Sequence, residues 1–210
     1  MDIDKFIEQR PYLYHLTSVE NSKRIIQEKI LVSTNELIDM SGNPDYFDIK
    51  RKRRIGHQEI VIGNKIYSLR DQRPISELAL SKCLTHNWKV PDFLEHLNDR
   101  VFMWPTLDRL ERHYNRYQNE NPVIFRFPTN EIIALNPNVK FCRLNSGATR
   151  ANSYLGGKAP DRGPETFLPA PNYNLSIGSV AEVTFEQRCN IDCDFAIASN
   201  PYSEFRRTKK

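Results

Sequence analysis

Short strand-like and helix-like segments alternate along this chain without a regular strand–helix–strand rhythm. Strand-forming residues run through 12–17, Ser18 then offers an N-cap, and residues 21–28 have the apolar spacing of a helix. A return to extended structure at 30–33 leads into a second helix at 33–40. The period of the apolar pattern therefore switches repeatedly between two and 3.6, which favours a mixed α+β fold over a parallel sheet.

The same patterns continue through the rest of the chain. Gly63-Asn64 separates two strand-like runs at 60–62 and 65–69, which indicates a hairpin with a two-residue turn. Further helices are predicted at 90–98, 107–118 and 130–135, and further strands at 100–104, 122–127, 140–144 and 179–185.

Length and composition predict a single domain. The chain has 210 residues, of which 39% are apolar and 27% charged, an ordinary globular composition. We expect one domain over residues 1–210, with a core at about 10–198 and a basic tail at 205–210. The apolar runs are too short for a membrane span and the first residues do not resemble a signal peptide, so we expect a cytoplasmic protein with no membrane partner.

Cysteine spacing argues against a metal site. Cys83 and Cys142 stand alone, and Cys189 and Cys193 are separated by three residues without a second Cys/His pair at zinc spacing. We expect reduced thiols and no metal cofactor.

Positive charge is concentrated although the formal net charge is only +4. Residues 50–54 are five consecutive cations, Lys-Arg-Lys-Arg-Arg. Such a run attracts nucleic-acid phosphates by releasing their counterions, and it is also typical of a solvated loop. Both interpretations remain open.

His15 and Thr17 form the first group of candidate site residues. They lie on one face of the predicted strand at 12–17, because side chains alternate along a strand. Two hydrogen-bonding side chains therefore point into the same space, as a ligand site or as a structural pair.

A second group follows the predicted strand at 140–144. Alternation places Arg143 and Asn145 on one face, and Ser146 begins a loop of about thirty residues, 145–174. An arginine can hold a diphosphate, while asparagine and serine can reach a ribose or an amide. In the same loop a Gly-Pro turn brings Arg162 near Glu165, as a substrate clamp or as a loop ion pair.

Glu182 is the most informative residue. It interrupts the predicted strand at 179–185, so it either faces solvent on an edge strand or lies in a cleft. A carboxylate in a cleft can hydrogen-bond a ribose hydroxyl and stabilise an oxocarbenium-like state while a glycosidic bond breaks.

These residues resemble the ADP-ribosyltransferase superfamily. Tyr14-His15-Leu16-Thr17 is similar to the strand that begins its NAD site, and Ala181-Glu182-Val183 is similar to the strand that carries its catalytic glutamate. DarT-type enzymes, which modify DNA bases, also open with Tyr-His-x-Thr and have a late Ala-Glu strand. The chain also resembles a bacterial domain family of unknown function over roughly 10–185. The segments that carry this second resemblance are 10–17, 69–72, 98–105, 141–147 and 162–167.

The first resemblance implies a mostly antiparallel split sheet with N-terminal helices packed on it, and NAD as a substrate. It assigns NAD binding to Tyr14, His15 and Thr17, the diphosphate to Arg100 or Arg143, and bond cleavage to Glu182, with Arg143 as a second catalytic residue. Asn145 and Ser146 complete the predicted NAD site, and Arg162 and Glu165 are predicted to contact the substrate.

The chain also departs from that superfamily. Trp104 or Tyr154 would have to replace its nicotinamide-stacking tyrosine, and Val180 stands where many protein-modifying members have Glu or Gln. This leaves DNA or RNA as the favoured acceptor. Two alternatives remain, an RNA 2′-phosphotransferase-like enzyme that uses Arg70, Arg100, Arg143 and Arg162 with His15, and a non-catalytic nucleic-acid- or protein-binding module. The sequence does not indicate the oligomeric state.

Overall fold

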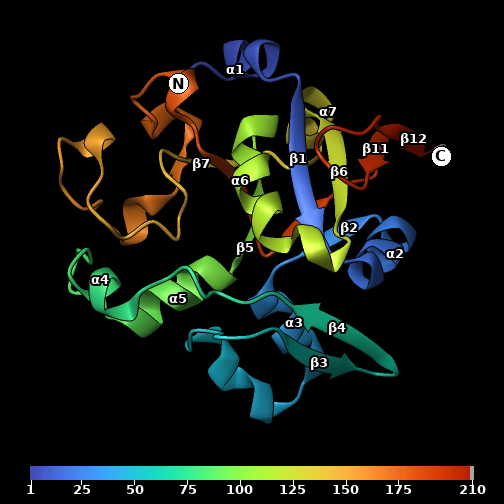
Figure 1. Ribbon diagram of the computed structural model, residues 1–210, viewed down its shortest axis with the longest axis horizontal. Helices are drawn as coiled ribbons and strands as arrows, with labels where there is room; N and C mark the ends of the chain where they lie inside the picture. Colours follow the sequence, from blue (N-terminus) through green and yellow to red (C-terminus); the bar gives the residue numbers. More distant parts are fainter. Residues whose placement is uncertain (209–210) are drawn as a thin grey trace. The chain divides into compact units, whose positions relative to one another are not determined.

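A computed structural model describes residues 1–208 of the chain, apart from the side chain of Tyr154 (Figure 1). Lys209 and Lys210 of the predicted basic tail, and the stacking role predicted for Tyr154, therefore lie outside the described residues. The chain forms two compact units that interleave in sequence. Unit 1 comprises residues 1–32, 101–144 and 168–210, and unit 2 comprises residues 33–100 and 145–167.

Unit 1 is built on two four-stranded sheets. The first sheet has the strand order β1 (Tyr12–Thr17), β6 (Val123–Pro128), β11 (Phe195–Ala198) and β12 (Arg206–Thr208). The second has the order β5 (Arg100–Met103), β9 (Glu182–Glu186), β7 (Lys140–Cys142) and β8 (Leu168–Pro169). A smaller sheet joins β2 (Ile30–Val32) to β10 (Arg188–Asn190). The pairs formed by β6 with β1 and β11, and by β7 with β8 and β9, are antiparallel, which confirms the predicted α+β class.

Four α-helices lie in the described part of unit 1. They are α1 (Ile3–Gln9), α2 (Val19–Glu28), α6 (Leu107–Tyr117) and α7 (Thr129–Leu135). Ser18 accepts a hydrogen bond from the N–H of Asn21 and so caps α2, as predicted. Phe6 of α1 and Ile25 of α2 are buried in the main hydrophobic core, so both N-terminal helices pack against the sheets.

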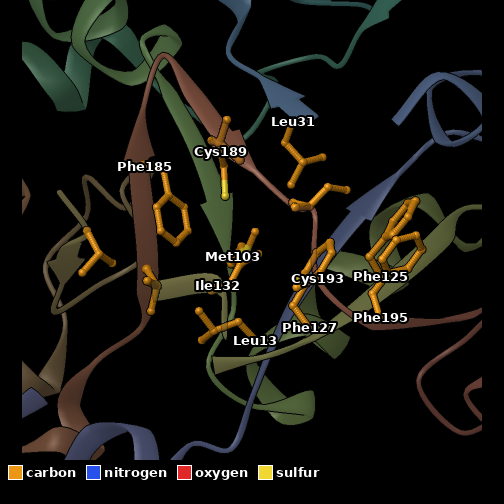
Figure 2. Packing of buried hydrophobic residues seen from close by; sticks show 14 of the residues in the cluster. Leu13, Leu31, Met103, Phe125, Phe127, Ile132, Phe185, Cys189, Cys193 and Phe195 are labelled. Carbon is orange, nitrogen blue, oxygen red and sulfur yellow. The ribbon is translucent and has the colours of Figure 1, made fainter. Parts of the chain in front are cut away.

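The main core of unit 1 is aromatic and aliphatic. Leu13 of β1, Phe127 of β6 and Phe195 of β11 belong to this core together with Met103 of β5 and Phe185 of β9, and Figure 2 labels these side chains. A second core lies on the opposite face of the first sheet, where Leu110 and Tyr117 of α6 pack against β1 and β6. Strands β1 and β6 are therefore apolar on both faces over part of their length.

The described residues of unit 2 form three α-helices, a hairpin and short 3-10 helices. The helices are α3 (Thr34–Ser41), α4 (Glu77–Ser81) and α5 (Val90–Asn98), and a 3-10 helix covers Pro44–Lys50. The strands β3 (Gln58–Ile62) and β4 (Lys65–Leu69) form the predicted hairpin, with Ile62 opposite Lys65 across the Gly63-Asn64 turn. Residues 145–167 of the long predicted loop complete this unit, with 3-10 turns at Ser153–Leu155 and Pro164–Thr166.

Candidate functional site

The predicted site residues are divided between the two units. Unit 1 contains Tyr14, His15, Thr17, Arg143 and Glu182, and unit 2 contains Arg100, Asn145, Ser146, Arg162 and Glu165.

The two large sheets of unit 1 meet where β1 touches the chain just after β5. Tyr14 and Trp104 form an isolated antiparallel bridge, with N···O distances of 2.9 and 2.8 Å between their backbones. One residue further along β1, Nδ1 of His15 lies 2.9 Å from the carbonyl oxygen of Phe102. A carbonyl can only accept, so Nδ1 carries the proton in this hydrogen bond. The bond fixes the orientation of the His15 ring at the junction between the sheets.

Tyr14 and Thr17 are both buried beside this junction. Tyr14 lies in the second core, and its ring centroid is 5.9 Å from that of Phe205. Burial raises the pKa of the Tyr14 hydroxyl above its usual value. Thr17 shares a face of β1 with His15 and is 6% exposed. Trp104, predicted as an alternative stacking residue, is packed in the same core against His113.

Glu182 begins β9, and β9 is not an edge strand. It lies between β5 and β7, and Glu182 is only 6% exposed. The alternative of a solvent-facing glutamate on an edge strand is therefore wrong. Burying a carboxylate is costly unless it is paired or used, so this position has a definite structural or chemical role.

Thr184 extends the polar character of this face of β9. It lies two residues after Glu182, on the opposite face from Val183 and Phe185, which belong to the main core. The residue is fully buried, and its hydroxyl oxygen has no hydrogen-bond partner among the described residues. A buried polar group without a partner is uncommon in folded proteins and marks a place where a ligand or water can bind. Thr184 was not among the residues predicted from the sequence, although it alternates with Glu182 in the predicted strand.

Arg143 lies at the end of β7, but not as predicted. The strand stops at Cys142, whose thiol lies 2.7 Å from the carbonyl oxygen of Leu144, and the chain bends there. The prediction that Arg143 and Asn145 share a strand face is therefore wrong, because neither residue is in the strand. Arg143 is exposed, and Asn145 belongs to unit 2.

Arg162 orders the long loop of unit 2 from within. It is 3% exposed, and its guanidinium donates to the carbonyl oxygens of Ala148 at 3.0 Å and Asn145 at 2.9 Å. Its own backbone N–H bonds to the carbonyl of Cys83. These hydrogen bonds explain how a long segment with little regular structure keeps one shape.

The other predicted residues of unit 2 have mixed environments. Ser146 is buried, whereas Asn145 and Glu165 are exposed. Arg100 is 6% exposed, and its guanidinium carbon lies 5.0 Å from the centre of the Phe167 ring, a cation–π contact.

The comparisons with known proteins identify a family. The model of a family of unknown function, DUF7002, matches residues 11–191, which is most of the chain. The chain belongs to this family. The predicted resemblance to a domain family of unknown function is thus confirmed, and it carries no assigned activity. No curated protein and no solved structure is detectably similar to the chain.

The basic run that suggested nucleic-acid binding is used inside unit 2. Arg51 pairs with Asp92 and Glu95 of α5, Lys50 with Asp39, and Lys52 with Asp48. Arg53 donates to the carbonyl oxygens of Gln72 and Arg73. Arg54 is 6% exposed and donates to Asn98 and to the carbonyl of Arg70. The run is therefore neither a free cationic stripe nor a simple solvated loop.

Asp71 anchors the segment that follows the hairpin. Its side chain is fully buried, accepts hydrogen bonds from the N–H and the guanidinium of Arg73 at 3.1 and 2.9 Å, and lies near His57. Burial alone raises the pKa of this carboxyl, but the hydrogen bonds and charge of Arg73 outweigh it, so the pKa of Asp71 lies below its usual value.

We expect Asp71→Asn to destabilise the protein at pH 7 and to remove part of its acid sensitivity. A lowered folded-state pKa stabilises the fold above the ordinary pKa of about 3.9, and this stabilisation is lost as the pH falls through the folded value. The melting-temperature difference between wild type and Asp71→Asn should therefore shrink as the pH falls below about 4. Asp161→Asn, at an exposed position of the same unit, serves as the control. A difference that stays constant with pH would contradict this prediction.

Three further features concern disulfide bonds, metal binding and membrane-spanning helices. All four cysteines are buried and free of disulfide bonds. Among the described residues, no group of three or more His, Cys, Asp or Glu side chains could hold a metal ion. No helix in the same part of the chain is both long and apolar enough to cross a bilayer.

Proposed function

We propose that this protein binds NAD and transfers its ADP-ribose group to an acceptor. One observation carries the proposal. The two residues that the superfamily resemblance singles out, His15 and Glu182, lie on the strands that flank β5: β1 is bridged to the chain just after β5, and β9 is its neighbour in the second sheet.

The arrangement of strands supports the same proposal. The first and second sheets of unit 1 touch at the isolated Tyr14–Trp104 bridge and do not continue as a ladder. A split antiparallel sheet of this kind is what the resemblance implies, and His15 lies directly beside the split.

The proposed chemistry follows from the side chains. His15 and Thr17 would bind a ribose, and Glu182 would hydrogen-bond the nicotinamide ribose. The bond from C1′ of that ribose to the nicotinamide nitrogen breaks, and its electron pair leaves with nicotinamide. The Glu182 carboxylate stabilises the positive charge that develops on the ribose. The acceptor then donates an electron pair to C1′ and releases its proton to water.

The 2′-phosphotransferase alternative is not proposed. It requires several arginines to grip a phosphate, but the guanidinium of Arg162 is bound to carbonyl oxygens of its own loop.

NAD binding can be tested by thermal denaturation of the full chain. A ligand bound only by the folded state stabilises it by about 3 kcal/mol at a hundredfold excess over its dissociation constant. We expect NAD to raise the melting temperature of the wild type, and His15→Ala to abolish the rise. His86→Asn is the control, because His86 is exposed in unit 2 and asparagine tolerates its left-handed backbone. No shift at millimolar NAD, or a shift kept by His15→Ala, would reject the proposed site.

A further inference from the structure

Arg126 contacts two aromatic rings on the face of the first sheet of unit 1 that also carries Tyr14 and the second core. Its guanidinium carbon is 4.6 Å from the centre of the Tyr12 ring and 4.7 Å from that of Phe205. Tyr12 comes from β1 and Phe205 immediately precedes β12, so three segments far apart in sequence build the arrangement. Stacking restricts the guanidinium plane and leaves its N–H groups directed outward in that plane.

The hydrogen-bonding capacity of Arg126 is not used within the described part of the chain. None of its guanidinium nitrogens hydrogen-bonds to a described residue or forms an ion pair with a described carboxylate, and the side chain is partly exposed. This contrasts with residues 50–54, whose cations are paired inside unit 2. A stacked guanidinium with open donors is suited to bidentate binding of a phosphate.

A second arginine lies in the same row of the sheet. Ala196 of β11 is opposite Arg126 of β6 on one side and opposite Arg207 of β12 on the other. Residues directly opposite in neighbouring strands share a face, so the two arginines flank a small alanine. Adjacent strands are about 4.8 Å apart, which separates the two arginine backbones by about 10 Å. Arg207 is exposed, and Tyr12 is 39% exposed.

We propose that this face, Tyr12, Arg126, Phe205 and Arg207, binds single-stranded nucleic acid. The arginines offer charge to the phosphates, and the partly exposed rings offer surfaces on which bases can stack. An acidic peptide would use the two cations but would leave the rings without a partner. The proposal adds an acceptor class to the proposed function, but the binding itself requires neither NAD nor Glu182.

The test is fluorescence anisotropy with the full chain and labelled single-stranded oligonucleotides, DNA and RNA, without NAD. We expect binding that weakens with salt. Arg126→Ala and Arg207→Ala should each weaken it about tenfold and lower the magnitude of the salt slope by about 1. Lys23→Ala removes the same charge from an exposed position on α2 and should leave the affinity unchanged.

Two further variants separate stacking from charge. Arg126→Lys keeps the charge but loses the planar group, and we expect it to bind more weakly than wild type. Tyr12→Ala should also weaken binding several-fold, because a base stacked on this ring loses its partner. Arg207 is exposed at the sheet edge, so its variant tests the face even where Arg126→Ala disturbs packing around Phe205.

Three results would overturn the inference. They are no oligonucleotide binding at 50 mM salt, an equal loss with Lys23→Ala, and equally tight binding of poly-glutamate. If oligonucleotides do not bind but NAD still raises the melting temperature, only the proposed nucleic-acid-binding face is rejected. Oligonucleotide binding without an NAD effect would instead remove the proposed catalytic function.

Discussion

Glu182→Gln is expected to lower the rate of NAD cleavage by about 10²–10³, equivalent to about 3–4 kcal/mol of transition-state stabilisation. Glutamine has nearly the same shape, so it should fit the buried position at the start of β9. It cannot supply the negative charge that stabilises the cationic ribose, which is why the rate should fall while NAD binding persists. Nicotinamide release, measured by chromatography with the full chain, gives the rate.

Glu186→Gln is the matched control for this prediction. Glu186 lies on the same strand and the same face, but it is exposed and pairs with Lys140. Glu186→Gln should keep the wild-type rate. Wild-type turnover in Glu182→Gln would remove Glu182 from the proposed mechanism.

Local sequence signals predicted much of the fold. Strand β1, the Ser18 cap and helix α2 follow one another as expected, because a capping side chain and apolar periodicity act over a few residues. The hairpin of β3 and β4 was equally predictable from its Gly-Asn turn. The end of β7 was not, because a thiol contact and the long loop that follows decide where the strand stops.

Charged residues show where local signals fail. A run of cations at 50–54 has the composition of a solvated or phosphate-binding segment, but its partners on α5 lie about forty residues further along the chain. Only the tertiary structure brings Arg51 next to Asp92 and Glu95. The sequence alone therefore predicts poorly whether a run of cations is free to bind a ligand when its acidic partners are distant in the sequence but close in the fold.

The signal that identified Glu182 was also present at Arg126. Glu182 is the single charge in the predicted strand 179–185, Arg126 is the single charge in β6, and both β9 and β6 are interior strands of their sheets. Arg126 was not recognised because the two rings beside it come from β1 and from the end of the chain. A single charged residue within a predicted apolar strand is therefore a candidate site residue, whether it is acidic or basic.

Asn98→Ala is expected to lower the free energy of unfolding by about 3 kcal/mol or more, since it removes the hub of a buried hydrogen-bond network in unit 2. Asn98 is 3% exposed at the end of α5, and its Oδ1 accepts from Arg54 Nη1 and Gln72 Nε2, each at 3.0 Å. Its Nδ2 donates to the Lys50 carbonyl at 2.9 Å. Alanine would leave the buried Arg54 guanidinium without this acceptor, and a buried charge that loses its partner is costly.

Urea unfolding of two further variants shows whether the network is the cause. Asn98→Asp keeps an acceptor for Arg54 but loses the donor to Lys50, so its loss of stability should be smaller than that of Asn98→Ala. Asn115→Ala removes the same side chain from an exposed position on α6 and should change stability by no more than about 0.5 kcal/mol. If Asn98→Ala unfolds at the wild-type urea concentration, then Arg54 has found another acceptor. If the loss of stability increases from Asn115→Ala to Asn98→Asp to Asn98→Ala, the difference between the last two variants reports the loss of the acceptor for Arg54.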